Sequence, residues 1–374
     1  MEELDLSVSK YDRAERITWW DQAKLLKSKV LIVGAGALGN EIVKNLALVG
    51  VGKLTIVDMD LIERTNLARC IFFRESDNGS PKSEVLAREA MRLNSDITTN
   101  FYTCPVQELG DAFFLDFDLI IAGLDNREAR VWLGSAAKRV GKTWIDGAIE
   151  GLMGKVQTFT PEGPCYACTM GENDWELIQK RKSCKLLGDD EILMGHTPTN
   201  ATTSSIIAGI QSQEAIKYLV GKPELAAIEN KVWRMIGEQM STFFSIVDID
   251  EDCPYHFANK EITSIFEIPN RLAELWSMTN QDENATLVFS DDFLLIKGCP
   301  KCTTASKLGW ADLLKGQGKC STCSEILDQE QFNRVELHDE ITKIALVQDF
   351  WPLKCLIDFQ SEILSSRHVV TRSI

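Results

Sequence analysis

The loop Gly-Ala-Gly-Ala-Leu-Gly at residues 34–39 constrains the fold of this chain more than any other feature. It follows directly on the apolar run Val30–Val33 and precedes a segment with apolar residues at helical spacing. In such a loop, Gly34 permits a tight turn, Gly36 lets the backbone approach a phosphate, and Gly39 lets the helix pack on the strand. The context therefore predicts a nucleotide-binding strand–loop–helix unit, which serves either NAD or ATP.

Further apolar runs alternate with helical patterns along the first two-thirds of the chain. We expect strands at residues 54–57, 119–121, 144–145 and 242–247, and helices at residues 40–50, from Pro81 onward and at residues 202–219. Apolar strands that alternate with helices are typical of a parallel sheet covered on both faces. The pattern predicts an α/β fold with a Rossmann-like, doubly wound, mainly parallel sheet over residues 1–258. A smaller C-terminal domain is expected over residues 259–374, where the alternation stops.

Composition excludes several classes of protein. The formal net charge of -15 repels phosphate backbones, so we expect no nucleic-acid partner. No apolar run approaches the ~18 residues of a membrane span, and the charged first twenty residues do not look like a signal peptide. These features predict a cytoplasmic protein with no membrane partner. In that compartment, cysteines at CxxC spacing indicate metal sites more than disulfides.

Charged and amide side chains follow several of the expected strands. They are Asp58, Asp60, Asn66, Arg69, Lys82, Asp125 and Asn126. Ligands bind at the carboxyl ends of the strands in open α/β sheets, so we expect these side chains to share a site. Arg69 and Lys82 can neutralise a triphosphate, Asp58 can bind ribose hydroxyls, and Asp125 can hold Mg²⁺. This favours ATP with magnesium. An NAD-dependent oxidoreductase remains the alternative, as does a purely structural role of Asp125 as a helix N-cap.

Four cysteines in the C-terminal part form two CxxC pairs with seventeen residues between them. They are Cys299, Cys302, Cys320 and Cys323. This spacing matches a zinc signature and predicts a structural zinc ribbon over residues 299–323. Its role, in docking a partner or in stabilising a small domain, stays open at this point. A nucleic-acid-binding ribbon is the alternative that the acidic composition disfavours.

In their order and spacing, five segments resemble the ThiF/MoeB group, which shares its adenylation domain with ubiquitin-activating enzymes. The segments are GAGALG, DMDLIERTNLAR, SPKSE, GLDNREAR and CYAC. The resemblance covers roughly residues 10–256. It is closest to homodimeric enzymes that activate ubiquitin-like proteins, such as those of the ubiquitin-fold modifier pathway and of bacterial ubiquitin-like conjugation operons.

The resemblance implies an activity. Mg-ATP would adenylate the C-terminal glycine of a small ubiquitin-like protein, and the acyl group would then pass to a cysteine as a thioester. A conjugating enzyme would be a further partner. The alternative is an adenylyltransferase of the MoeB/ThiF type that serves sulfur transfer and forms no thioester of its own.

The resemblance also implies roles for individual residues. The ribose ligand, the three phosphate ligands and the magnesium ligand of the family correspond here to Asp58, to Asn66, Arg69 and Lys82, and to Asp125. Arg13 lies in a Tyr-x-Arg context before the first strand, where the family places an arginine that reaches into the neighbour's ATP site. The single glycine loop then implies a homodimer.

A second metal site is implied by position. Cys165-x-x-Cys168 and Cys253-x-x-His256 lie where the family carries the two halves of a structural zinc site. Three cysteines and a histidine are a sound tetrahedral set, so we expect about two zinc ions per chain. The alternative is that Cys253 and His256 are unrelated to the first pair.

Cys184 is the candidate nucleophile. It lies in the cationic run Lys180–Lys185, and adjacent cations lower the pKa of a thiol. An activated cysteine can accept an acyl group from an adenylate. The family carries its acyl-accepting cysteine in a crossover loop, which corresponds here to about residues 169–200. The alternative is a surface cysteine or a spare zinc ligand.

Overall fold

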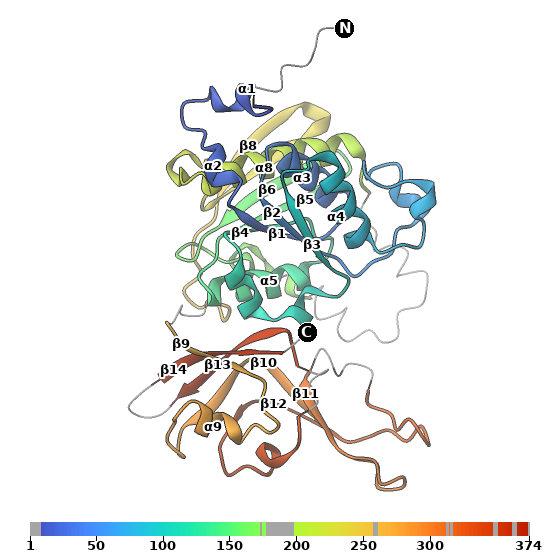
Figure 1. Cartoon of the computed structure of the whole chain (residues 1–374), viewed down its shortest axis with the longest axis vertical. Helices are drawn as coiled ribbons and strands as arrows, with labels where there is room; N and C mark the ends of the chain where they lie inside the picture. Colours follow the sequence, from blue (N-terminus) through green and yellow to red (C-terminus); the bar gives the residue numbers. More distant parts are fainter. Residues whose placement is uncertain are drawn as a thin grey trace. The chain divides into compact units, whose positions relative to one another are not determined.

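The computed structural model packs as two compact units (Figure 1). It describes residues 9–172, 174–176, 198–256, 261–311, 314, 317–346, 351–360 and 365–372. The first unit comprises Met1–Pro105 and Leu115–Phe257, and the second comprises Val106–Phe114 and Ala258–Ile374. The short segment Val106–Phe114 thus belongs to the second unit, although it lies far from the rest of that unit in the sequence.

An eight-stranded sheet forms the centre of the first unit. Its strands are β1 (Lys29–Val33), β2 (Lys53–Val57), β3 (Thr98–Tyr102), β4 (Leu119–Ala122), β5 (Trp144–Glu150), β6 (Met153–Phe159), β7 (Lys231–Ile236) and β8 (Ser241–Ile246). They lie in the order β3-β2-β1-β4-β5-β6-β7-β8. The pairs from β3 to β5 are parallel, and β6, β7 and β8 extend the sheet by antiparallel pairing. The expected Rossmann-like, mainly parallel α/β class is confirmed.

Helices cover both faces of this sheet. On one face, α3 (Ala37–Leu48) packs between α4 (Lys82–Leu93) and α8 (Ala201–Leu219). On the other face lies α5 (Arg127–Arg139) (Figure 1). Its Gly134 leaves room for the ring of Trp144 in β5. The central strand β1 is therefore buried from Val30 to Val33, which is why its sequence is continuously apolar.

The N-terminal segment adds two short helices, α1 (Asp12–Glu15) and α2 (Gln22–Leu25), ahead of the sheet. The helix expected at residues 40–50 in fact begins at Ala37, because Gly36 is already the N-cap residue. The helix expected from Pro81 begins at Lys82, with Pro81 as the N-cap residue.

The second unit is built on a six-stranded sheet with β10 (Thr286–Ile296) paired to three neighbours. The other strands are β9 (Ile262–Glu267), β11 (Lys307–Trp310), β12 (Gln329–Val335), β13 (Lys354–Gln360) and β14 (Ser365–Thr371). The helix α9 (Glu274–Met278) follows β9. Pairing is antiparallel except between β14 and β9. Interlocking aromatic rings fill the core, with Phe293 5.1 Å from both Trp310 and Trp351.

The segment Val106–Phe114 is fastened to β13 and the residues before it. A side-chain oxygen of Asp111 accepts a hydrogen bond from the Leu356 amide at 2.9 Å, and the Glu108 carbonyl accepts one from the Leu353 amide at 3.1 Å. Gly110 lies so close to this strand that a Cβ atom there would come within 2.0 Å of the Lys354 carbonyl oxygen. These two hydrogen bonds and the close packing of Gly110 against the Lys354 carbonyl hold the segment in the second unit.

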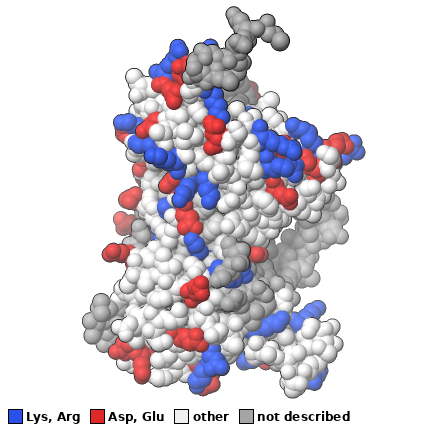
Figure 2. Space-filling view, in the orientation of Figure 1, with Lys and Arg blue, Asp and Glu red and all other residues white. Residues whose placement is uncertain are grey.

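Charges of both signs are interspersed on the face drawn in Figure 2, including the region near α4. Two ion pairs involve arginines of α4: Arg88 lies 3.3 Å from Asp77, and Arg92 lies 2.7 Å from Glu89. Within the described part of the chain, no helix has the length and apolarity needed to cross a membrane.

Candidate functional site

Three loops meet at the carboxyl ends of β2, β1 and β4, which are adjacent strands. The Gly34 amide donates to the Val57 carbonyl at 2.8 Å, and the Gly123 amide donates to the Val33 carbonyl at 2.9 Å. These bonds fix the loop after each strand to the end of its neighbour. The arrangement places the glycine loop in the middle, with the loop of Asp58 on one side and the loop of Asp125 on the other.

The three glycines of the loop serve different purposes. Gly34 has a φ of +99°, and a Cβ there would lie 2.7 Å from the Gly123 carbonyl oxygen. At Gly39 a Cβ would lie 2.0 Å from the Gly34 carbonyl oxygen, so this glycine allows α3 to pack against the turn. Gly36 has nothing within 4 Å of that position. Open space therefore lies beside the first amides of α3, and a helix N-terminus of this kind can stabilise a phosphate.

Asp58 closes the glycine loop from the β2 side. Its Oδ2 accepts a hydrogen bond from the Ala35 amide at 2.6 Å, and its Oδ1 accepts one from the Asp60 amide at 2.8 Å. Burial raises the pKa of this carboxyl, although both hydrogen bonds act in the opposite direction. Asp58 thus lies directly at the loop where the sequence predicted a ribose ligand.

The cations that follow β2 approach the same region. Lys82 is the first residue of α4, and its Nζ lies 2.8 Å from Asp60 Oδ2 with only 12% of the side chain exposed. Asn66 is buried, and its backbone carbonyl accepts a hydrogen bond from the Arg69 amide at 3.0 Å. Arg69 is half-buried and has no ion pair among the described residues. A cation held in place without a carboxylate is suited to bind an anionic ligand.

Asn40, which the sequence analysis did not single out, links two of these segments. Its Nδ2 donates to the Ala35 carbonyl at 2.9 Å, and its Oδ1 accepts from the Phe72 amide at 3.2 Å. Asn40 is fully buried. It therefore ties the glycine loop to the chain that follows Arg69, and its position in the first turn of a helix after a glycine loop was the available signal.

Asn126 caps the helix α5, whereas Asp125 leaves its carboxylate exposed. Asn126 is the N-cap residue of α5, and its Oδ1 accepts a hydrogen bond from the Ala129 amide at 2.7 Å. The alternative in which Asp125 caps the helix is therefore wrong. Asp125 is exposed, and the described residues give its carboxylate no hydrogen bond or ion pair. Its oxygens are available for a hard cation such as Mg²⁺.

Arg130 holds the Asp125 loop through a hydrogen bond to the residue before Asp125. It is buried, its Nε donates to Asp146 Oδ1 at 2.9 Å, and its Nη2 donates to the carbonyls of Leu124 and, at 3.1 Å, Gly147. No motif in the sequence predicted a role for Arg130. The signal was an arginine on the same helical face as the buried Leu133 and Ala137, where an unpaired charge would be costly.

Arg13 lies in α1 and is exposed, with no ion pair among the described residues. The preceding Tyr11 is buried and anchors the segment: its hydroxyl donates to Asp96 Oδ2 at 3.1 Å and accepts from Asn94 Nδ2 at 2.9 Å. The anchored tyrosine therefore holds Arg13 at the surface of the first unit.

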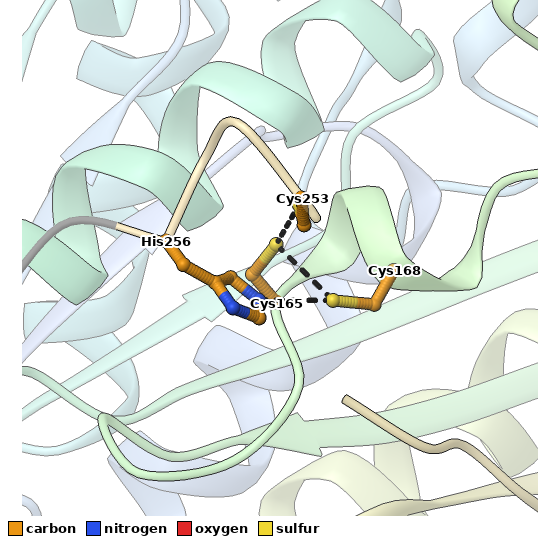
Figure 3. Close-up of side chains that lie close together, drawn as sticks. All are labelled: Cys165, Cys168, Cys253 and His256. Carbon is orange, nitrogen blue, oxygen red and sulfur yellow. Dashed lines mark hydrogen bonds between the residues drawn. The ribbon is translucent and has the colours of Figure 1, made fainter. Parts of the chain in front are cut away.

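The first cysteine set converges in the first unit (Figure 3). The Sγ of Cys165 lies 3.7 Å from that of Cys168 and 3.6 Å from that of Cys253, and Cys168 Sγ lies 3.0 Å from His256 Nε2. Zn–S bonds of about 2.3 Å in a tetrahedron place sulfurs about 3.8 Å apart, so the donor set fits zinc. The hydrogen bond with Cys165 lowers the pKa of Cys168 to about 4, which favours one thiolate.

The second cysteine set lies in the second unit. The ligand atoms of Cys299, Cys302, Cys320 and Cys323 lie within 4.8 Å of one another, and the sulfurs of Cys299 and Cys323 are 3.8 Å apart. Four sulfur donors with no carboxylate or histidine among them suit a closed structural zinc site.

Comparison with known proteins settles the family. Residues 10–255 match the model of the ThiF family. The chain belongs to the ThiF family. The SAMP-activating enzyme E1 of Haloferax volcanii is 30% identical over 270 residues, which are 67% of this chain and 90% of that protein. The match to the ThiF family confirms the resemblance that the sequence motifs carried.

Other relatives match a smaller part of this ThiF-family chain. The NEDD8-activating enzyme E1 catalytic subunit of Schizosaccharomyces pombe is 43% identical over 150 residues, 38% of this chain and 34% of that protein. The adenylyltransferase and sulfurtransferase MOCS3 of Arabidopsis thaliana is 32% identical over 206 residues, 54% of this chain and 42% of that protein. The match thus spans about a third of the fission yeast relative and less than half of the plant one.

A solved structure shares the fold. The crystal structure of E. coli MccB with ATP superposes with a TM-score of 0.53 at 23% identity, over 63% of this chain and 68% of that chain. At this identity the likeness concerns the fold alone.

The predicted nucleophile of this ThiF-family member, Cys184, lies outside the described residues. Among the described cysteines, Cys70 follows Arg69 directly, but burial raises the pKa of its thiol to about 11. Cys70 is therefore protonated at neutral pH and poorly suited to nucleophilic attack.

Proposed function

We propose that this ThiF-family chain uses ATP and magnesium to adenylate the C-terminal glycine of a ubiquitin-like protein. The observation that carries the proposal is the convergence of an open glycine loop, Arg69, Lys82 and the unpaired carboxylate of Asp125 at the carboxyl ends of adjacent parallel strands. The names of the Haloferax and fission yeast relatives, both activating enzymes, support the choice of acceptor.

The reaction breaks one phosphoanhydride bond. A carboxylate oxygen of the acceptor attacks the α-phosphorus, the bond from that phosphorus to the bridging oxygen breaks, and pyrophosphate leaves with the electron pair. Negative charge grows on the phosphoryl oxygens and on pyrophosphate, so fixed cations accelerate the step. Arg69 and Lys82 would supply those cations, Asn66 would be a further phosphate ligand, and Asp58 would bind the ribose. Magnesium, held by Asp125, would add further positive charge.

A homodimer would complete each site. Arg13 is exposed and unpaired within the described chain, and Tyr11 holds it at the surface. We propose that it enters the ATP site of the partner subunit as a further phosphate-directed cation. Each chain carries one glycine loop, so two equivalent composite sites would form.

We further propose that the acyl group moves to Cys184. The thiolate attacks the carbonyl carbon of the acyl adenylate, the bond from that carbon to the phosphate oxygen breaks, and AMP leaves. The lysines and arginine of residues 180–185 favour the thiolate. Two zinc ions would stabilise the fold, and a conjugating enzyme would receive the thioester. Cysteines at metal-ligand spacing suit a cytoplasmic location.

The deciding experiment is ATP–pyrophosphate exchange with small candidate proteins that end in glycine. Exchange that requires the acceptor supports adenylation. An NAD-dependent oxidoreductase would instead bind NADH and show no exchange.

The second step is tested separately. The Cys184→Ala protein is expected to keep exchange and to lose a reductant-sensitive adduct seen on non-reducing gels. An adduct that persists in this variant places the nucleophile elsewhere. If the unaltered protein forms no adduct, the sulfur-transfer alternative gains support, and the plant relative's name as a sulfurtransferase gives that alternative its motive.

A further inference from the structure

Two cations face each other across neighbouring strands of the first unit. Lys155 of β6 is directly opposite Arg234 of β7 in the antiparallel register. Side chains at such positions point to the same face of the sheet, with Cβ atoms about 4.5–5.5 Å apart. Like charges in this arrangement destabilise a sheet, so the pair carries a cost that needs an explanation.

Neither cation has a carboxylate partner among the described residues. Lys155 is half-buried, and its Nζ lies 5.8 Å from the centre of the Tyr166 ring. Arg234 donates only to the Ser245 hydroxyl, at 3.3 Å, within the described chain. Burial lowers the pKa of Lys155, and the charge of Arg234 acts in the same direction.

Two carboxylates near Lys155 are already engaged in ion pairs. Asp146, which acts on Lys155 electrostatically, forms an ion pair with Arg130 at 2.9 Å. Asp174 forms one with Arg127 at 2.8 Å. Lys155 and Arg234 therefore add two positive charges that these two ion pairs do not compensate.

The uncompensated pair lies close to the proposed reaction centre. Arg130 contacts the carbonyl of Leu124, the residue before Asp125, and also the carbonyl of Gly147 in β5. β5 pairs directly with β6, where Ala148 is opposite Lys155. The Arg130–Asp146 ion pair thus bridges the space between the Asp125 loop and Lys155.

We propose that Lys155 and Arg234 form an anion-binding site for a carboxylate side chain in the C-terminal segment of the acceptor protein. This inference rests on the proposed adenylation function. An acceptor whose terminal glycine lies at the α-phosphate must lead its preceding residues away over the surface, at about 3.3 Å per extended residue. A glutamate or aspartate in that stretch would neutralise the cationic pair. Acceptors with a lysine or arginine there would be rejected by repulsion.

The test measures the binding of fluorescent ten-residue peptides that end in Gly-Gly, without ATP. In each peptide a single Glu, Gln or Lys replaces one residue, and this residue is moved from the third to the seventh position before the glycines. The unaltered protein is expected to bind a Glu peptide at one position about tenfold more tightly than the matched Gln peptide. Lys155→Gln and Arg234→Gln are expected to abolish that preference, and Lys155→Glu with Arg234→Glu is expected to transfer it to the Lys peptide.

Lys231→Gln is the matched control, because Lys231 is an exposed lysine of β7, the strand that carries Arg234. It is expected to leave the preference for Glu unchanged. Equal binding of Glu, Gln and Lys peptides at every position would overturn the proposal, as would a preference that survives in Lys155→Gln. Because the assay contains no ATP, its outcome is independent of pyrophosphate exchange, which tests adenylation itself.

A second measurement addresses the cost of the pair in the free protein. Lys155→Gln is expected to raise the melting temperature by about 1–3 °C relative to Lys231→Gln, since it removes the repulsion. A lower melting temperature would show that Lys155 already has a stabilising partner and would overturn the proposal.

The chain's own acidic run at residues 189–191 is the competing source of a carboxylate. The triple variant Asp189→Asn, Asp190→Asn, Glu191→Gln is expected to bind the Glu peptide with unchanged affinity. Binding that becomes about tenfold tighter would assign the site to that run and overturn the proposal.

Discussion

Arg130 and Asp146 form a buried ion pair, with 2.9 Å between Arg130 Nε and Asp146 Oδ1 and residue exposures of 6% and 2%. The same guanidinium donates to the carbonyls of Leu124 and Gly147. One side chain thus joins the first turns of α5, the Asp125 loop and β5. The loop of Asp125, the predicted magnesium ligand, is therefore fixed in part by the buried side chain of Arg130.

Arg130→Met is expected to destabilise the first unit by about 3–5 kcal/mol, because it leaves the Asp146 carboxylate buried without a partner. Urea unfolding followed by tryptophan fluorescence measures the loss. The double variant Arg130→Met, Asp146→Asn removes the buried charge as well and is expected to recover most of the stability. A loss below about 1 kcal/mol in the single variant would contradict the importance of the pair.

Asp125→Ala is expected to reduce pyrophosphate exchange by at least about a hundredfold while the protein stays folded. The side chain is exposed and unpaired within the described chain, so its loss changes stability by less than about 0.5 kcal/mol. Asn126→Ala is the comparison for stability. It removes the N-cap hydrogen bond of α5 and is expected to lower the free energy of unfolding by about 1 kcal/mol. Undiminished exchange by Asp125→Ala would remove this residue from the site.

Mixed dimers test the role of Arg13. Each of Arg13→Ala and Asp125→Ala is expected to inactivate a homodimer, yet a mixture of the two proteins should regain activity. In the mixed dimer, one of the two composite sites has both its Arg13 and its Asp125 intact. Exchange assays after mixing measure the recovery. Inactive mixtures in which heterodimers have formed would show that Arg13 does not act in the partner's site.

Elemental analysis is expected to find about two zinc ions per chain, one for each converging set of four ligands. Cys165→Ser and Cys299→Ser are each expected to lose one ion, and the two losses should be independent. A protein that holds one zinc, loses it in Cys299→Ser and keeps it in Cys165→Ser would show that the Cys165 set binds no zinc.

Much of the first unit's sheet followed from local sequence. The strands at Val30–Val33 and Leu54–Val57 are buried on both faces, so runs of apolar and β-branched residues identify them. β3 escaped prediction because it is an edge strand of the sequence Thr-Thr-Asn-Phe-Tyr, whose side chains are mostly exposed. The order of strands in the second unit depends on long-range pairing, such as β9 with β14, which no local pattern encodes.

The candidate site shows a similar division. Residues at the ends of apolar strands, such as Asp58 and Asp125, could be selected because strand ends meet at one edge of the sheet. Arg130 and Asn40 could not be selected by that rule, since they act through hydrogen bonds to backbone carbonyls of other loops. The assignment of the helix cap to Asn126 instead of Asp125 depends on a one-residue difference in where α5 begins.

The placement of Val106–Phe114 in the second unit has a consequence for where the chain can be divided into fragments. The chain passes from one unit to the other after Pro105, after Phe114 and after Phe257. A fragment that ends at residue 257 would contain Val106–Phe114 without β13, the strand that binds it. A fragment that begins at residue 258 would leave the Leu356 amide without its hydrogen bond to the Asp111 side chain. A cut at residue 257 therefore separates the segment Val106–Phe114 from the strand that binds it, and the second unit is complete only with a segment that lies within the sequence range of the first.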